Sequence, residues 1–157
     1  MNKLFLYDEN SVLPATLGLM NRKGYTCWPL SENSDFFWQS ISKLENGAVF
    51  VLLSHGNESG PLAVKGDKGH DIDLNKFSSV IKEKNLLLYL LSCHTGRDPC
   101  GKTLTDNNVQ FVAPLGLAVF QTVGTDMINI HSKEGKINPG WAGPLSPDRA
   151  TKPLFLP

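Results

Sequence analysis

Cysteine is scarce in this chain of 157 residues, which contains only Cys27, Cys93 and Cys100. So few cysteines, in an odd number, exclude a scaffold stapled by many disulfides and favour folding in a reducing compartment with at least one free thiol. Their spacing fits no usual zinc signature, and His70 and His131 are isolated in polar stretches. We therefore expect neither a metal nor another cofactor.

Net charge is also lacking, because 15 basic and 15 acidic residues cancel. The chain thus has no overall electrostatic footprint for nucleic acid or an anionic membrane. No apolar run approaches the ~18 residues that span a bilayer. The apolar stretch 3–7 is too short for a signal peptide and is cut off by Asp8 and Glu9. We expect no nucleic-acid or membrane partner, and a protein that is cytoplasmic in its producing cell or delivered into a target cell by a carrier.

The composition that remains is that of an ordinary folded domain, with 41% hydrophobic and 19% charged residues. A chain of this length can bury roughly 70% of its unfolded surface in one core. No internal repeat or linker divides it. We therefore predict a single domain over 1–157, with a core over about 1–131. Five of the ten prolines follow residue 132, so we expect an irregular, Pro- and Gly-rich tail over about 132–157.

Hydrophobic periodicity predicts strands that alternate with amphipathic helices along most of the chain. Strands are expected at 3–7, 25–30, 49–53, 86–91 and 109–114, helices at 12–23, 34–44 and 74–84, a short helix at 102–107, and a strand pair at 119–123 and 127–131. Ser34 is the candidate N-cap of the second helix. This alternation indicates an α/β fold with a mainly parallel sheet.

Two buried strands in the middle of the chain end in residues that can carry chemistry. The strand 49–53 runs into Ser54-His55-Gly56, and the strand 86–91 runs into Ser92-Cys93-His94. The helix between them makes a crossover unit, which is right-handed and sets its two strands parallel. If the strands are neighbours, their carboxyl ends lie ~5 Å apart, at the edge where open α/β sheets place their ligands.

A cysteine and a histidine that meet at such an edge can form a nucleophile and its base. Cysteine attacks as the thiolate, which a neighbouring imidazole generates by accepting the proton. We therefore predict Cys93 as the nucleophile and His55 as the base. The backbone N–H groups of Gly56 and Cys93 are the candidate donors to an oxyanion.

The residues around this pair suggest a substrate cleft without deciding its charge. Asn57, Glu58, Arg97 and Asp126 are the candidate lining residues, and their charges are of opposite sign. In a less favoured interpretation Asp8, at the end of the first strand, reaches the same rim and helps to orient His55.

The order of strand–Ser-His-Gly, helix and strand–Ser-Cys resembles the caspase-like cysteine peptidases of clan CD. The segments 90–96, 101–104, 109–114 and 139–141 are similar to the small CHAT-like C-terminal domains of Rhs and other polymorphic bacterial toxins. This resemblance covers about residues 48–143. It implies a three-layer sandwich, with a mainly parallel central sheet and helices on both faces, and His55 and Cys93 as the catalytic residues.

The resemblance also implies an activity and its partners. The protein would be a bacterial cysteine endopeptidase, a toxin or effector that cleaves a host or competitor protein, or an autoprocessing domain that cleaves its own carrier chain. A protein or peptide would be the substrate, and a cognate immunity protein would protect the producing cell. Two alternatives stay open: a non-catalytic caspase-like module for protein interaction, and a thiol acyltransferase or deamidase that uses the same dyad.

Overall fold

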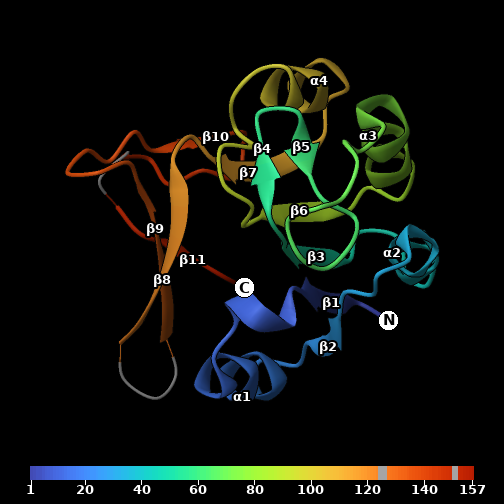
Figure 1. Cartoon of the computed structure of the whole chain (residues 1–157), viewed down its shortest axis with the longest axis horizontal. Coiled ribbons are helices and arrows are strands. Elements are labelled where there is room, and N and C mark those ends of the chain that lie inside the picture. The colour runs from blue at the N-terminus through green and yellow to red at the C-terminus, as the bar shows by residue number, and fades with distance from the viewer. Residues whose placement is uncertain (124–126, 150–151) are drawn as a thin grey trace.

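The computed structural model describes residues 1–123, 127–149 and 152–157. Its centre is a six-stranded sheet with the order β10-β7-β6-β3-β1-β2, which Figure 1 shows from β7 at the top to β2 at the bottom. Neighbouring strands are parallel, except that β10 runs antiparallel to β7 at the edge. The strands are β1 (Lys3–Tyr7), β2 (Thr26–Pro29), β3 (Val49–Leu53), β6 (Leu87–Leu90), β7 (Gln110–Pro114) and β10 (Trp141–Ala142).

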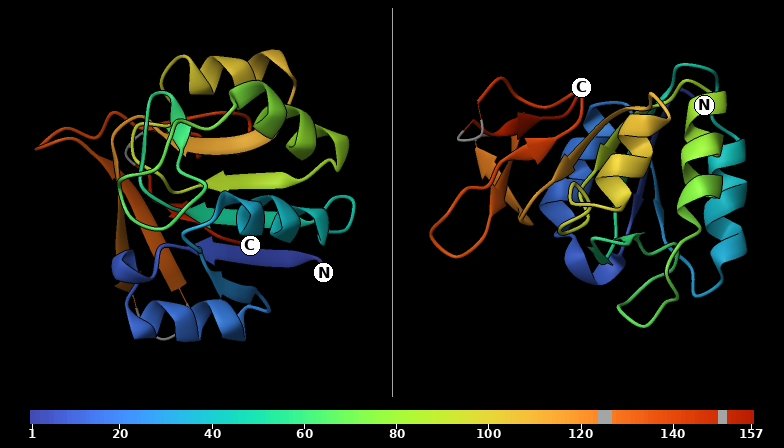
Figure 2. Two further views of the ribbon diagram at one scale, coloured as in Figure 1. Left: turned by 45° about the vertical axis from the view of Figure 1, so that its right-hand side comes forward. Right: turned by 90° about the horizontal axis from the view of Figure 1, so that it is seen from above.

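One face of this sheet is covered by helices. They are α2 (Ser34–Ser42), α3 (Leu74–Glu83) and α4 (Cys100–Asp106), and Figure 2 shows α2 and α3 side by side. Phe37 and Phe77 pack from α2 and α3 onto Phe50, Leu88 and other buried residues of the strands. Alternate strand residues point to this face, because side chains alternate along a β-strand.

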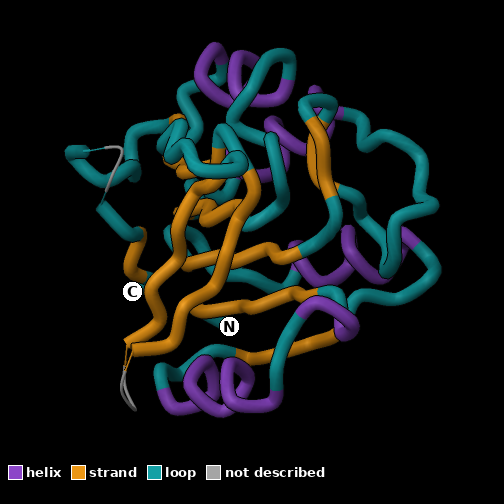
Figure 3. Tube along the Cα trace, turned by 60° about the vertical axis from the view of Figure 1, so that its left-hand side comes forward, coloured by secondary structure: helices purple, strands orange, loops and turns teal. Residues whose placement is uncertain are grey.

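The opposite face is covered by one helix and by a second sheet. The helix is α1 (Pro14–Arg22), which follows the short 3-10 turn η1 (Glu9–Ser11). The second sheet has the order β11-β9-β8 and is antiparallel, with strands β8 (Leu117–Val123), β9 (Met127–Lys133) and β11 (Leu154–Phe155). Figure 3 shows the long β8–β9 hairpin running across the main sheet. Met20, Ile130 and Leu154 pack here against Phe5 and Val51.

The tail therefore takes part in the core. Leu154 and Leu156 are buried, and the Tyr25 hydroxyl donates a hydrogen bond of 3.0 Å to the carbonyl oxygen of Pro157. Strands of two residues are too short to show a periodicity, so β10 and β11 could not be recognised from the sequence.

The mainly parallel sheet and its helices agree with the sequence-based prediction, but one helix cap does not. Asn33, and not Ser34, is the N-cap of α2, because its extended backbone lets its Oδ1 accept a hydrogen bond of 2.8 Å from the Asp35 N–H. Ser34 is already the first helical residue. A further small hairpin, β4 (Gly56–Asn57) and β5 (Gly60–Pro61), lies between β3 and α3, where no strand was predicted. Among the described residues, no helix has the length and apolarity needed to cross a bilayer.

Candidate active site at the carboxyl ends of β1, β3 and β6

The register of β3 and β6 brings His55 and Cys93 to the same edge of the sheet. Within the two strands, Leu52 pairs with Leu90, an offset of 38 residues. The same offset continues beyond the strands, because Ser92 Oγ lies 3.0 Å from Ser54 Oγ and accepts a hydrogen bond of 3.3 Å from the Ser54 N–H. His55 and Cys93 are the next residues on each chain. Both residues therefore lie just beyond the carboxyl ends of neighbouring parallel strands.

Asp8 approaches His55 from the strand on its other side. The Asp8 N–H donates a hydrogen bond of 2.8 Å to the Leu53 carbonyl, which extends the pairing of β1 with β3. Oδ2 of Asp8 lies 3.1 Å from Nε2 of His55, and the carboxylate is almost entirely buried while the imidazole is 48% exposed. Oδ1 accepts from the Asn10 N–H at 3.3 Å. The ring N–H is not aligned for a hydrogen bond, and no other described group bonds to Oδ2, so His55 is the polar neighbour of this oxygen.

Three residues therefore lie in a row at the carboxyl ends of three adjacent strands. Asp8 follows β1, His55 follows β3 and Cys93 follows β6, in the order in which these strands lie in the sheet. A thiol, an imidazole and a buried carboxylate in this order are the parts of a nucleophile, its base and the group that orients the base. Asp8 was predicted only in the less favoured interpretation, because its local signal is no more than a polar residue at the end of a strand.

The Cys93 thiol is free and partly exposed on a tightly held turn. The Thr95 hydroxyl donates a hydrogen bond of 2.7 Å to the Ser92 carbonyl, and the His94 N–H donates to the Gly116 carbonyl at 2.9 Å. His94 has a left-handed backbone with φ of 62°. Cys93 is consequently presented from a fixed backbone, which suits a residue that must meet a substrate in one orientation.

The other two cysteines are less suited to nucleophilic attack. Cys100 is completely buried at the start of α4, and this burial raises the pKa of its thiol to about 12. Burial also raises the pKa of the Cys27 thiol. Because the thiolate is the reactive form, both residues are expected to react slowly near neutral pH.

Gly56 brings the His55 segment into contact with the Cys93 turn. A Cβ at this position would lie 2.7 Å from Ser92 Cβ and 3.1 Å from Thr95 Cγ2, so a larger residue does not fit without movement. The backbone carbonyl of His55 accepts a hydrogen bond of 2.8 Å from the Leu62 N–H. Because paired residues alternate along an antiparallel hairpin, the next pair, Gly56 with Pro61, is a non-hydrogen-bonded pair. The Gly56 N–H thus points away from β5.

The second candidate oxyanion donor is the backbone N–H of Cys93. Among the described residues, this N–H donates no hydrogen bond. Two backbone donors on contacting segments are a suitable arrangement for an oxyanion that forms above the thiol.

The four residues predicted to line a substrate cleft lie in different parts of the structure. Asn57 and Glu58 are exposed on the β4–β5 hairpin, where Asn57 Oδ1 accepts from the Ser59 N–H at 2.7 Å and the Glu58 carbonyl accepts from the Cys100 N–H at 3.0 Å. Arg97 lies on the opposite flank of Cys93, where its guanidinium donates to the Leu115 carbonyl at 2.8 Å. Asp126 lies outside the described residues.

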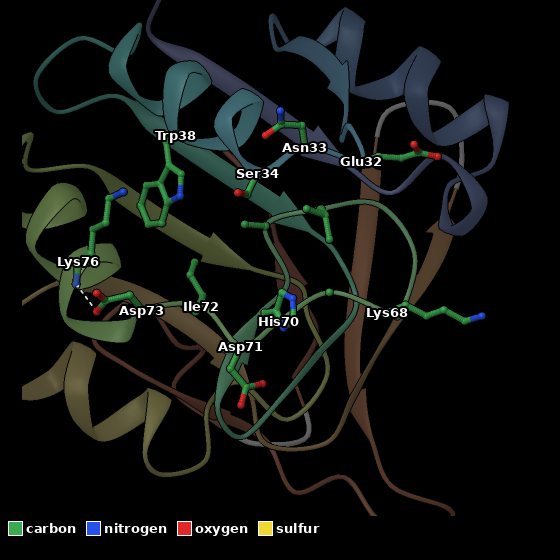
Figure 4. A pocket seen from close by; sticks show the side chains of 13 residues that line it. Glu32, Asn33, Ser34, Trp38, Lys68, His70, Asp71, Ile72, Asp73 and Lys76 are labelled. Carbon is green, nitrogen blue, oxygen red and sulfur yellow. Dashed lines mark hydrogen bonds between the residues drawn. The ribbon is translucent and has the colours of Figure 1, made fainter.

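A separate cavity of about 830 Å³ opens between α2, the loop 63–73 and the start of α3. Neither His55 nor Cys93 lines it. In Figure 4, Trp38 and Lys76 lie on one side of the cavity, and the Lys76 ammonium is 4.1 Å from the centroid of the Trp38 ring. Acidic and basic side chains both line this cavity, so its charge does not select one class of ligand. The lining charged residues are Glu32, Lys68, Asp71, Asp73 and Lys76.

No family model matches this sequence, and no curated protein matches it. Among solved structures, the chain is similar to the aromatic-amino-acid aminotransferase from Burkholderia pseudomallei, which was solved covalently bound to pyridoxal phosphate. The identity is 13%, the TM-score is 0.45, and the match covers 70% of this chain but 30% of the aminotransferase. A likeness this weak supports no conclusion about the fold or the activity of this protein.

Proposed function

We propose that this protein is a cysteine endopeptidase of the caspase-like type. The observation that carries the proposal is the row of Asp8, His55 and Cys93 on three adjacent strand ends. Cys93 is the nucleophile and His55 the base, while Asp8 is a positioning residue that holds the imidazole. The mainly parallel sheet with helices on both faces is compatible with a caspase-like sandwich, although the second sheet adds to one of its layers.

In the proposed mechanism the two nitrogens of His55 have different tasks. In this mechanism Nε2, which lies 3.1 Å from the carboxylate, carries a proton, and Nδ1 accepts the proton of the Cys93 thiol. The thiolate then adds to the carbonyl carbon of the peptide bond. The Gly56 and Cys93 N–H groups donate to the oxygen that becomes negative in this step.

The remaining steps return every group to its starting state. The imidazolium of His55 gives its proton to the leaving amine, the C–N bond breaks, and the acyl group stays on Cys93 as a thioester. Water then attacks the thioester while His55 accepts one of its protons. Collapse of this second intermediate releases the new carboxyl end and the Cys93 sulfur, which recovers its proton from His55.

The resemblance of the segments around His55 and Cys93 supports a biological setting. In this setting the protein is a bacterial toxin or effector, or an autoprocessing domain, and a protein is its substrate. A cognate immunity protein would bind the domain in the cell that makes it.

The test compares single variants in cells that produce the domain, followed by a search for new peptide N-termini in total protein by mass spectrometry. We expect Cys93→Ala and His55→Ala each to abolish both the growth defect and the new N-termini, while Cys27→Ala and His70→Ala leave them unchanged. Retention of the growth defect in both active-site variants would instead indicate a binding module. If both active-site variants lose the growth defect but the wild-type protein produces no new N-termini, acyl transfer or deamidation is indicated instead.

A further inference from the structure

The hairpin β4–β5 fixes the backbone of His55. This residue directly precedes β4, and its carbonyl accepts a hydrogen bond of 2.8 Å from the N–H of Leu62, which directly follows β5. Each strand of the hairpin has only two residues, and an isolated hairpin is at best marginally stable in water. The contacts that hold the hairpin in place therefore also decide where the His55 backbone lies.

Gly60, in β5, is the residue at which the core holds this hairpin. It is buried, and its φ of 120° is one that glycine adopts readily. A Cβ added here would lie 2.8 Å from Cγ2 of Ile72 and 2.9 Å from Cδ2 of Leu74. Ile72 is 9% exposed at the end of the loop before α3, and Leu74 is the first residue of that helix. Because Gly60 has no side chain, both of these side chains can pack directly against the hairpin backbone.

The start of α4 holds the hairpin at a second place. Cys100 is the first residue of α4, and its backbone N–H donates a hydrogen bond of 3.0 Å to the Glu58 carbonyl. Its side chain is completely buried, and a Cβ added at Gly60 would lie 3.9 Å from its Sγ. Because α4 follows the Cys93 turn, these contacts tie the hairpin to the segment that carries the proposed nucleophile.

We infer that Ile72 and Cys100 are positioning residues for His55, which act through the hairpin and do not touch the reacting atoms. They fill the space beside Gly60 and so fix the hairpin, whose Leu62 N–H holds the His55 carbonyl. A displacement of about 1 Å in a catalytic group can cost about 10²-fold in rate, even when its cause is remote from the chemistry. The inference rests on the proposed function, because His55 is the base of that reaction.

The test compares the loss of the Ile72 contact with an equal loss elsewhere in the core. Ile72→Ala opens a space beside the hairpin, and the control Ile81→Ala removes the same atoms from a completely buried position in α3. Both variants should lower the melting temperature. Ile72→Val is the conservative variant, because valine keeps the Cγ2 methyl group that approaches Gly60.

Kinetics on a peptide that the wild-type protein cleaves are measured at a temperature where every variant is folded. Ile72→Ala should lower kcat about tenfold while KM stays within about twofold. Ile81→Ala and Ile72→Val should keep both constants within about twofold of the wild type. A change in kcat at Ile72 alone distinguishes positioning from a general loss of stability.

Two further measurements do not require catalysis. The NMR signal of the His55 Cε1–H, assigned with His55→Ala, reports the surroundings of the ring. The rate at which iodoacetamide alkylates Cys93, followed by peptide mapping at pH 7.5, reports whether the imidazole still reaches the thiol. Ile72→Ala should shift the signal and slow the alkylation about threefold, while Ile81→Ala and Ile72→Val change neither.

Cys100→Ala is a smaller truncation of the same contact, and it serves if Ile72→Ala does not fold. It should act in the same direction, with Cys27→Ala in β2 as its control. The inference is overturned if Ile72→Ala and Ile81→Ala change the His55 signal and the alkylation rate equally, or if Ile72→Ala and Cys100→Ala change neither. Failure of the proposed function is distinguishable, because the wild-type protein would then cleave no peptide while the signal and the alkylation rate still measure the contact.

Discussion

The hydroxyl oxygens of Ser54 and Ser92 lie 3.0 Å apart, and both side chains are buried. They join the segments that follow β3 and β6, and the next residue of each segment is a predicted catalytic residue. We therefore expect the relative position of His55 and Cys93 to depend on this hydroxyl pair, which has no part in the proposed mechanism.

Replacement of Ser92 by alanine should loosen this arrangement. The change leaves the Ser54 N–H and hydroxyl without a partner in a buried position, which typically costs about 1–3 kcal/mol. We expect a lower free energy of unfolding in urea and a peptidase rate reduced more than the stability loss alone explains. Ser79→Ala, on the exposed side of α3, is the matched control and should change neither quantity. An unchanged rate at Ser92→Ala would show that the pair does not position the dyad.

Replacement of Asp8 by asparagine keeps the shape of the side chain but removes its charge. Without the carboxylate, the imidazolium that forms during attack by Cys93 is less stabilised, and we expect kcat to fall by about 10²-fold with little change in KM. Steady-state kinetics on a cleaved peptide measures this split. Glu9→Gln, at the exposed neighbouring position, is the control and should retain full activity. A rise in KM with kcat unchanged would contradict a positioning role.

Alkylation should distinguish the three thiols. Burial raises the Cys100 pKa from 9.0 to about 12, which lowers its thiolate fraction near neutral pH by about 10³-fold, and the side chain is also inaccessible. With iodoacetamide at pH 7.5, peptide mapping should find the label first on Cys93 and more slowly on Cys27, with Cys100 protected until the protein unfolds. Labelling confined to Cys27 or Cys100 would refute the proposed mechanism.

Gly56→Ala should disturb the candidate active site through steric overlap alone. The new methyl group would meet Ser92 Cβ at 2.7 Å, so the hairpin or the Cys93 turn must move, and overpacking of this kind costs about 1–3 kcal/mol. We expect reduced stability together with a lower kcat. Gly18→Ala in α1 is the matched control, because its added Cβ has room and should stabilise the helix by about 0.5–1 kcal/mol. Equal thermal stability of both variants would argue against the close packing of Gly56.

The local order of the fold could be predicted from the sequence because it depends on short-range periodicity. The continuous apolar run of Val49–Leu53 is typical of a strand buried on both faces. The spacing of Phe77 and Ile81 likewise predicted the amphipathic helix between the two central strands. The parallel pairing of β3 with β6 is confirmed, since a crossover of this kind permits little else.

The sequence by itself thus determined the longer strands, the helices and the positions of His55 and Cys93 at the ends of two neighbouring strands, because each depends on local pattern or on one crossover. Only the tertiary structure decided the neighbours of that pair. The placement of β1 beside β3 brings Asp8 to His55, and the turn after β9 brings Glu134 to Arg97, 37 residues away. No local pattern encodes such contacts, because strand order and the docking of a distant turn follow from how the whole core packs.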